Sequence, residues 1–260
     1  MLLLRHWLEA RLMFENPIKL EILMTTGASR GREPHRYVLP MLVIAVLGLL
    51  VSGVSPANAS GRGLQSSQHT SATSLLAAKW WQWALTQPGS KSPLTDTTGQ
   101  FCRQGQRGNV WFLAGNFGGQ PSSPINRTCT IPGGKDLFFP LVNQFSGYQV
   151  GVDPLAAASV TAQRAIVDAS QVQESTGLSV TVDGQPAPFE FEKSVPFVVV
   201  LPLPDNIFGL TDHLLLVPTV DAGYYAYVRA LRPGPHTIAF TGTQPGQARI
   251  AVTYQLIVGR

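Results

Sequence analysis

The amino-acid sequence predicts a mainly β fold: an antiparallel β-sandwich, of jelly-roll or immunoglobulin-like type, with one or two packed helices. Two observations lead to this prediction. From Leu178 onward, short apolar runs alternate with turns rich in Gly and Pro, as they do in antiparallel sandwiches. After residue 60, helical periodicity occurs only in the first part of the chain, and no strand–helix–strand alternation indicates a parallel sheet.

Residues 1–59 are predicted to be a secretory signal peptide with an upstream extension. An apolar run at 38–51 follows an arginine-containing flank, and residues 57–59 supply the Ala-Asn-Ala cleavage signal. We therefore expect cleavage between Ala59 and Ser60. An uncleaved anchor is the alternative, but a membrane-spanning helix needs about 20 apolar residues, more than this run offers.

The region after the cleavage site is predicted to hold a flexible leader at 60–73 and a single β-sandwich domain at 74–260. Met24 would start a signal peptide of ordinary length, which makes residues 1–23 the extension. Residues 60–260 contain 13 Lys and Arg against 11 Asp and Glu, a net charge of +2 without a basic cluster. This balance gives no indication of nucleic-acid binding.

The chain contains two cysteines, Cys102 and Cys129, both in the part predicted to be exported. Thiols are oxidised in exported proteins, so we predict a disulfide between them. The bridge should stabilise the fold by roughly 3–4 kcal/mol in the chain-entropy model. Two free buried thiols and a redox pair are the alternatives, and the spacing is unlike the Cys-x-x-Cys of redox pairs.

Two helices are predicted, near 74–86 and 154–167. The apolar side of the first carries four residues: Leu76, Trp80, Trp83 and Ala84. The second is expected to begin with Asp153 as its N-cap and Pro154 in its first turn.

Apolar or alternating runs separated by turns are the expected strands. The last run alternates over 247–258, which indicates a strand with one buried face, and Asp183-Gly184 is a hairpin signal. The predicted strands lie at 110–114, 128–131, 137–142, 178–182, 189–192, 195–201, 224–231, 237–241 and 247–258.

Several blocks of the sequence resemble a group of uncharacterised exported bacterial proteins. The group shares a Trp-rich helix, a two-cysteine block and a C-terminal β-sandwich, and the likeness covers nearly all of the predicted mature chain. It implies a compartment and a fold, but no activity and no catalytic residues. The blocks that carry it are Lys79–Ala84, Thr98–Cys102, Val110–Gly115, Arg127–Pro132, Gly134–Lys135, Phe138–Asn143, Val182–Gly184 and Leu231–Phe240.

Exposed aromatic residues are the candidate binding residues. Trp81 lies about 120° from the mean direction of Trp80 and Trp83, given 3.6 residues per turn, so we expect it to be exposed and able to stack on a sugar. Tyr225, Tyr227 and Arg229 share one side of a predicted strand and would form a binding surface if that side faces solvent. Core packing is the alternative for each of these aromatic residues.

No catalytic or metal-binding residues are predicted. Glu190 and Glu192 would lie about 7 Å apart on one strand face, near the spacing of glycosidase carboxylate pairs, but an ordinary half-buried strand is the simpler explanation. His213 and His236 have no ligand partners at metal-site spacing. We expect His236 to bond a nearby backbone group.

The functional prediction is a non-catalytic β-sandwich protein, secreted or periplasmic, that binds a glycan or another component of the cell envelope. We expect no cofactor, no nucleic-acid partner and no membrane contact beyond the signal peptide. One alternative is a secreted, glycosidase-like hydrolase with paired carboxylates. The other is a purely structural envelope protein.

Overall fold

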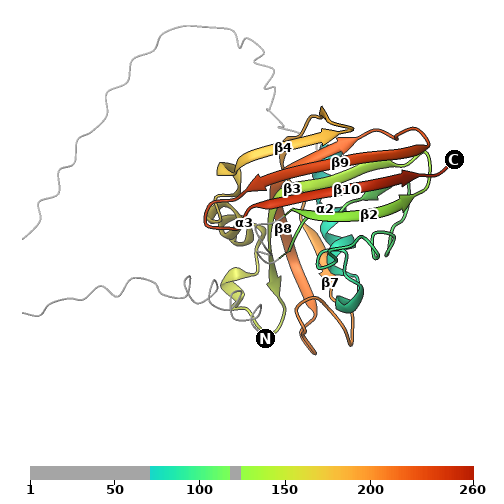
Figure 1. Ribbon diagram of the computed structural model, residues 1–260. Coiled ribbons are helices and arrows are strands. Elements are labelled where there is room, and N and C mark those ends of the chain that lie inside the picture. The colour runs from blue at the N-terminus through green and yellow to red at the C-terminus, as the bar shows by residue number, and fades with distance from the viewer. Residues whose placement is uncertain (1–70, 118–123) are drawn as a thin grey trace, which may run out of the picture. The chain divides into compact units, whose positions relative to one another are not determined.

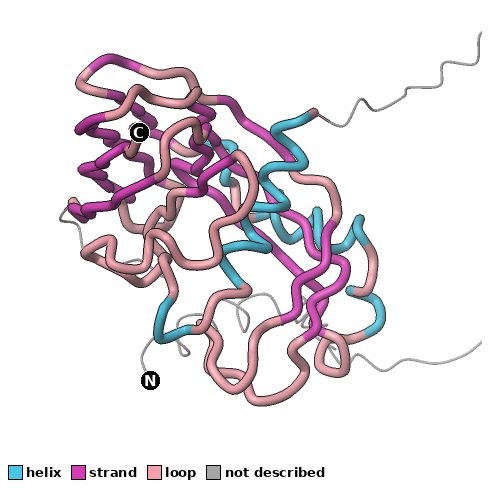
Figure 2. Tube along the Cα trace, turned by 90° about the vertical axis from the view of Figure 1, so that its right-hand side faces the viewer, coloured by secondary structure: helices cyan, strands magenta, loops and turns pink. Residues whose placement is uncertain are grey.

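The computed structural model describes residues 71–117 and 124–260, which belong to one compact unit, His69–Arg260. This unit is mainly β, with two five-stranded sheets and two α-helices (Figure 1). Long loops and turns connect these elements (Figure 2). The predicted signal peptide, its cleavage site at Ala59 and Ser60, and leader residues 60–70 lie outside the described residues.

One sheet, here called sheet A, is built around two 14-residue strands, β3 and β8, which run antiparallel. On the far side of β8, both β6 and β7 pair with it, and β1 pairs with β3. The strands of sheet A are β1 (Val110–Phe112), β3 (Asp136–Gln149), β6 (Glu190–Lys193), β7 (Phe197–Val200) and β8 (Leu215–Val228).

The other sheet, sheet B, has the order β2-β10-β9-β4-β5. Val182 and Gln185 pair across the predicted Asp183-Gly184 hairpin turn, and both turn residues have positive φ, as a type I′ turn requires. The strands of sheet B are β2 (Ile125–Ile131), β4 (Thr176–Val182), β5 (Gln185–Pro186), β9 (Gly234–Thr243) and β10 (Ile250–Val258).

Both sheets are mixed, so the prediction of purely antiparallel pairing is wrong. β1 runs parallel to β3, and β2 runs parallel to β10 along its whole length. The chain alternates between sheets at its start, so β1 and β3, which flank β2 in sequence, lie together in sheet A. A strand that returns to its own sheet after a passage through the other one is free to pair in parallel, because no tight hairpin joins the two.

Side chains from both sheets meet in one apolar cluster. Along β3, Phe138 and Phe139 are both fully buried but belong to different clusters, because successive strand residues point to opposite faces. Phe139 packs among sheet B residues such as Phe240, at a ring distance of 4.9 Å. Phe138 lies on the other face, in the cluster that includes the Trp residues of α2.

Helix α2 (Ala72–Leu85) begins two residues earlier than predicted, because the Ser71 side chain caps it by accepting a hydrogen bond from the Ser74 amide at 2.8 Å. The expected leader therefore ends before residue 73. A short 3₁₀-helix, η1 (Gly89–Lys91), follows the helix. Among the described residues, no helix is long and apolar enough to cross a membrane.

Helix α3 (Val160–Ala169) starts later than predicted. The N-cap is Ser159, whose hydroxyl accepts a hydrogen bond from the Ala162 amide at 3.1 Å, and only a 3₁₀ turn, η2 (Leu155–Ala157), follows Pro154. The Asp153 carboxylate instead accepts a hydrogen bond from the Gln149 amide, at the end of β3. Because its carboxylate makes this contact, Asp153 does not cap the helix.

The predicted disulfide between Cys102 and Cys129 is confirmed. It joins the turn after Gly99 to β2, and the Thr128 amide donates to the Thr98 carbonyl oxygen at 2.9 Å beside it. Such bridges are typical of proteins that fold outside the reducing cytosol.

Candidate functional site

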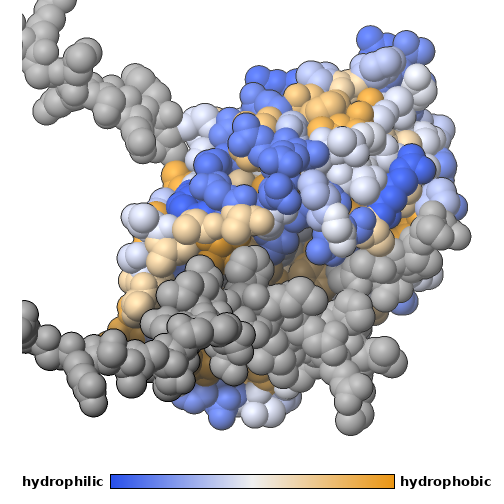
Figure 3. Space-filling view, turned by 90° about the vertical axis from the view of Figure 1, so that its left-hand side faces the viewer, coloured by the Kyte–Doolittle hydropathy of each residue, from blue (hydrophilic) through white to orange (hydrophobic). Residues whose placement is uncertain are grey.

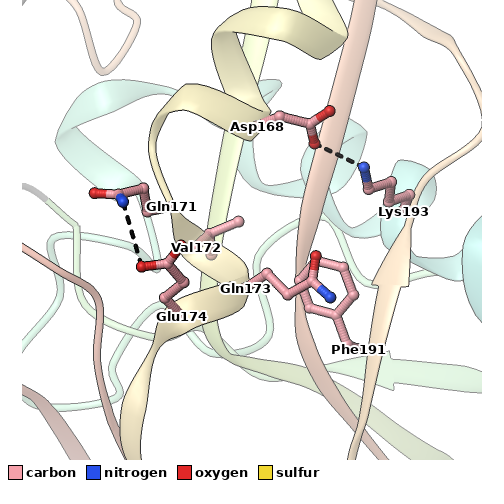
Figure 4. Close-up of a pocket in the computed structure, with 7 residues that line it drawn as sticks. All are labelled: Asp168, Gln171, Val172, Gln173, Glu174, Phe191 and Lys193. Atoms are coloured by element: carbon pink, nitrogen blue, oxygen red, sulfur yellow. Dashed lines mark hydrogen bonds and ion pairs between the residues drawn. The ribbon is translucent and has the colours of Figure 1, made fainter.

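A pocket of about 430 Å³ lies between α3, the 3₁₀-helix η3 (Val172–Glu174) and strand β6 (Figure 4). It lies within the volume range of small-molecule sites. The molecular face that carries α3 mixes hydrophilic and hydrophobic residues (Figure 3). The pocket is lined by Asp168, Gln171, Val172, Gln173, Glu174, Phe191 and Lys193.

One wall of the pocket is aromatic. The Phe191 ring is half-buried and packs edge-on against Tyr224 of β8, with ring centroids 5.1 Å apart. The Tyr224 hydroxyl donates to the Gln173 carbonyl oxygen at 2.9 Å, so one tyrosine positions both the aromatic wall and the η3 segment. Figure 4 shows the Gln173 side chain beside the Phe191 ring.

The rest of the rim is polar. Lys193 Nζ lies 2.7 Å from Asp168 Oδ1, an ion pair that joins β6 to α3, and both side chains remain about half exposed, at 45% and 54%. Gln171 Nε2 donates to Glu174 Oε2 at 3.3 Å. These amide and charged groups offer donors and acceptors around the Phe191 ring.

The local backbone explains how η3 reaches the pocket. Helix α3 ends at Ala169, and Gln171 then adopts a left-handed conformation with φ of 56°. This turns the chain so that Val172 enters the core while the side chains of Gln173 and Glu174 face outward.

Trp81 is not exposed, which corrects the expectation for this residue. Only 3% of it is accessible, because its indole Nε1 donates to Asp221 Oδ2 at 2.7 Å. Tyr225 is also buried, and its hydroxyl donates to Asp221 Oδ1 at 2.8 Å. Neither side chain is available to stack on a ligand. Both belong to a buried polar network.

The Asp221 carboxyl is fully buried, and desolvation raises its pKa to about 7, although the hydrogen bonds from Trp81 and Tyr225 and the positive charge of Arg164 oppose that shift. Arg164 of α3 donates to the main-chain oxygens of Asp221 and Ser194. The network therefore ties α2 and α3 to strand β8 of sheet A.

Tyr227 and Arg229 lie apart from both the network and the pocket. The Tyr227 hydroxyl donates to Asp136, and this hydrogen bond lowers the pKa of the Asp136 carboxyl. Arg229 lies over the Tyr227 ring at 5.4 Å, with its side chain 85% exposed. The predicted surface of three residues is thus reduced to a cluster in which Arg229 is exposed and Tyr227 and Asp136 are half-buried.

The two glutamates of β6 have partners at the start of α2. Glu190 accepts a hydrogen bond from Thr73 at 2.8 Å, and Glu192 accepts one from Ser71 at 3.1 Å. Burial is the main cause that raises the pKa of Glu192. Their position beside the N-terminus of a helix favours a role in helix docking.

The Nε2 atom of His236 lies 2.8 Å from the Arg232 carbonyl oxygen, which confirms the expected backbone contact. Its Nδ1 lies 2.7 Å from Asp183, and this contact raises the pKa of the imidazole. Across residues 71–117 and 124–260, no three His, Cys, Asp or Glu side chains form a group that could hold a metal ion.

The sequence analysis did not identify the pocket residues. Asp168, Gln171 and Glu174 lie in a polar stretch that carries no recognisable motif. One signal was present: Phe191 and Lys193 are two residues apart, a spacing that places both side chains on the same face of a strand. The pairing of β6 with β8, which places that strand beside η3, has no local sequence signature.

No protein-family model matches the chain, and no curated protein matches it. Among solved structures, it is similar in part to the solution structure of amebosin, at 14% identity over 51% of this chain and 88% of that chain. The TM-score is 0.18, which supports no inference about fold or activity.

Proposed function

We propose that this chain is an exported, non-catalytic β-sandwich protein that binds a glycan, free or as part of the cell envelope, in the pocket beside Phe191. The observation that carries the proposal is the combination of one aromatic wall with amide and charged groups around it. A sugar presents an apolar C–H face and a rim of hydroxyl groups, and this pocket offers a complementary surface for both.

Binding is favoured over hydrolysis by the state of the pocket carboxylates. Asp168 is paired with the Lys193 ammonium group, and Glu174 accepts a hydrogen bond from the Gln171 amide. A glycosidase needs one carboxyl free to donate a proton and another free to attack or to activate water. The β6 pair, Glu190 and Glu192, is engaged with the start of α2.

The export part of the proposal rests on two features that agree. The sequence carries the predicted signal peptide, and the disulfide forms between the two cysteines that follow it. The protein would then act in the periplasm or outside the cell, where envelope polysaccharides are accessible.

A glycan array and a polysaccharide pull-down with the disulfide-intact protein test this proposal. We expect one class of glycan to be retained, and Gln173→Ala and Phe191→Ala to weaken that binding by about tenfold or more. Gln185→Ala, on the exposed hairpin strand β5, is the matched control and should bind as the wild type does. Thermal melting checks that Phe191→Ala is folded.

Two results would overturn the proposal. One is the absence of any retained glycan. The other is binding that survives the exposed-residue change Gln173→Ala and the folded Phe191→Ala variant alike. Release of reducing sugar from a bound glycan would instead support the hydrolase.

A further inference from the structure

A second, larger groove of about 850 Å³ lies between α2 and the segment 104–112, and it differs in chemistry from the pocket beside Phe191. We propose that this groove binds a small amphipathic anion: an apolar chain or ring that carries one acidic group. The groove has three features that suit such a ligand: an apolar floor, a positive charge and walls held in a fixed position.

The floor of the groove is apolar and aromatic. Trp83 of α2 and Phe112 of β1 lie with ring centroids 5.5 Å apart, and Leu76 and Val110 also line the space. Phe112, Leu76 and Val110 are each only half-buried, so part of their surface remains open to a ligand. Burial of that surface would drive binding of an apolar chain.

The walls are held in place by hydrogen bonds. The Trp83 indole donates to the Gln104 carbonyl oxygen at 2.8 Å, and the side-chain Nε2 of Gln87 donates to the Trp83 carbonyl oxygen at 2.6 Å. The first of these bonds joins the two sides of the groove without a ligand, and the second fixes the end of α2. A preformed groove lowers the entropy that binding must overcome.

The charge of the groove is positive only. Lys79 and Arg107 are exposed and line the groove, and no carboxylate is among the lining residues. In residues 71–117 and 124–260, neither cation forms an ion pair with a carboxylate. Lys135, which is not a lining residue, donates from Nζ to the carbonyl oxygen of the lining residue Gly108 at 2.6 Å, so a third positive charge lies beside the groove.

Positive charge is concentrated around this groove. Residues 60–260 contain only 13 Lys and Arg. Three of these cations lie around one groove, and no acidic residue is among the residues that line it. Positive rim charges attract an acidic group, and the aromatic floor accommodates the apolar part attached to it. A neutral sugar would use neither feature fully.

Decanoate, kept below its micellar range, is the probe. We expect isothermal titration calorimetry to show saturable binding to the purified protein, and amide and indole NMR shifts to concentrate at Trp83, Val110 and Phe112. Decylamine carries the same chain with the opposite charge, and acetate carries the same charge without the chain. Both should bind at least about tenfold more weakly than decanoate.

Charge variants test the assignment of the residues. Lys79→Ala with Arg107→Ala should weaken decanoate binding by about tenfold or more, and the reversal to Lys79→Glu with Arg107→Glu should favour decylamine instead. Lys91→Ala, an exposed cation outside the groove lining, is the matched control and should leave binding unchanged.

Equal binding of decanoate and decylamine would overturn the proposal, because it would indicate an apolar surface without charge selection. Equal binding of acetate would reduce the site to an adventitious ion site and overturn it as well. Binding that survives the double alanine variant, or no binding of decanoate at all, has the same consequence. Glycan binding at Phe191 is independent of each of these outcomes.

Discussion

The Asp221 carboxyl is the group whose acid–base chemistry the fold changes most. It has no solvent exposure, accepts hydrogen bonds from Trp81 and Tyr225, and faces the Arg164 side chain of α3. Burial nevertheless dominates and raises its pKa to about 7. The carboxyl is therefore largely protonated in mildly acidic solution while the protein is folded, and largely ionised at pH 8.

Stability should fall as the pH rises toward and through 7, since the folded state binds a proton that the unfolded state has already released. The ordinary pKa of the unfolded carboxyl is 3.8, so Asp221 stabilises the fold fully below that value and loses the contribution as pH rises through its folded pKa of about 7. We expect this group to remove about 2–3 kcal/mol of unfolding free energy between pH 5 and pH 8. Urea denaturation at both pH values measures it.

Asp221→Asn isolates the effect, because the amide keeps a hydrogen-bonding side chain of the same shape but does not titrate. The unfolding free energy of the variant, relative to that of the wild type, should increase by that same amount from pH 5 to pH 8. A difference between the two proteins that is constant across this range would contradict the raised pKa.

At the scale of the element, the Cys102–Cys129 bridge closes a sequence separation of 27 residues and attaches the turn after Gly99 to β2. β2 lies at one edge of sheet B, so the turn also covers part of an otherwise open strand edge. Loss of the bridge should loosen this edge first.

The double change Cys102→Ser with Cys129→Ser removes the bridge without leaving a free thiol. Loss of roughly 3–4 kcal/mol of stabilisation should lower the melting temperature by about 5–15 °C. Differential scanning calorimetry with and without reductant measures the change. A melting curve of the variant that matches the wild type without reductant would mean that the bridge does not stabilise the fold. With reductant, which opens the wild-type bridge, the two curves should converge.

The elements predictable from sequence are those with a strong local pattern. Alternation along β10 correctly placed Val252, Tyr254 and Leu256 in the core, and the Asp183-Gly184 signal located the hairpin. The long strands were predicted too short. β8 begins at Leu215 and continues through Pro218, a residue that normally ends a strand and that here follows a cis peptide bond.

The sites were less predictable than the elements, for a physical reason. Helical spacing gives the direction of Trp81 correctly relative to its neighbours, but it cannot show that a buried carboxylate from β8 lies there, 140 residues later in the chain. The pocket beside Phe191 likewise depends on long-range pairing of β6 with β8. Local sequence patterns carry no information about such contacts.

At the scale of the whole molecule, the export proposal predicts where the chain begins after processing. In a bacterial host that secretes it, we expect intact-mass spectrometry to find a protein starting at Ser60 outside the cytosol. Ala59→Arg should block cleavage, because signal peptidase accepts only small residues at this position, while Ala59→Gly should be processed normally. Recovery of the full-length chain from the cytosol, with both cysteines titratable, would contradict export.

The position of β10 in sheet B has a consequence for the order in which the protein can assemble. β10 is the last of the described strands, yet it lies between β2 and β9, so β2, the earliest strand of this sheet, has no strand neighbour until β10 is present. A nascent polypeptide emerging N-terminus first must therefore keep β2 without its partner strand until β10 has emerged. Truncation of the last ten residues would divide the sheet rather than shorten it.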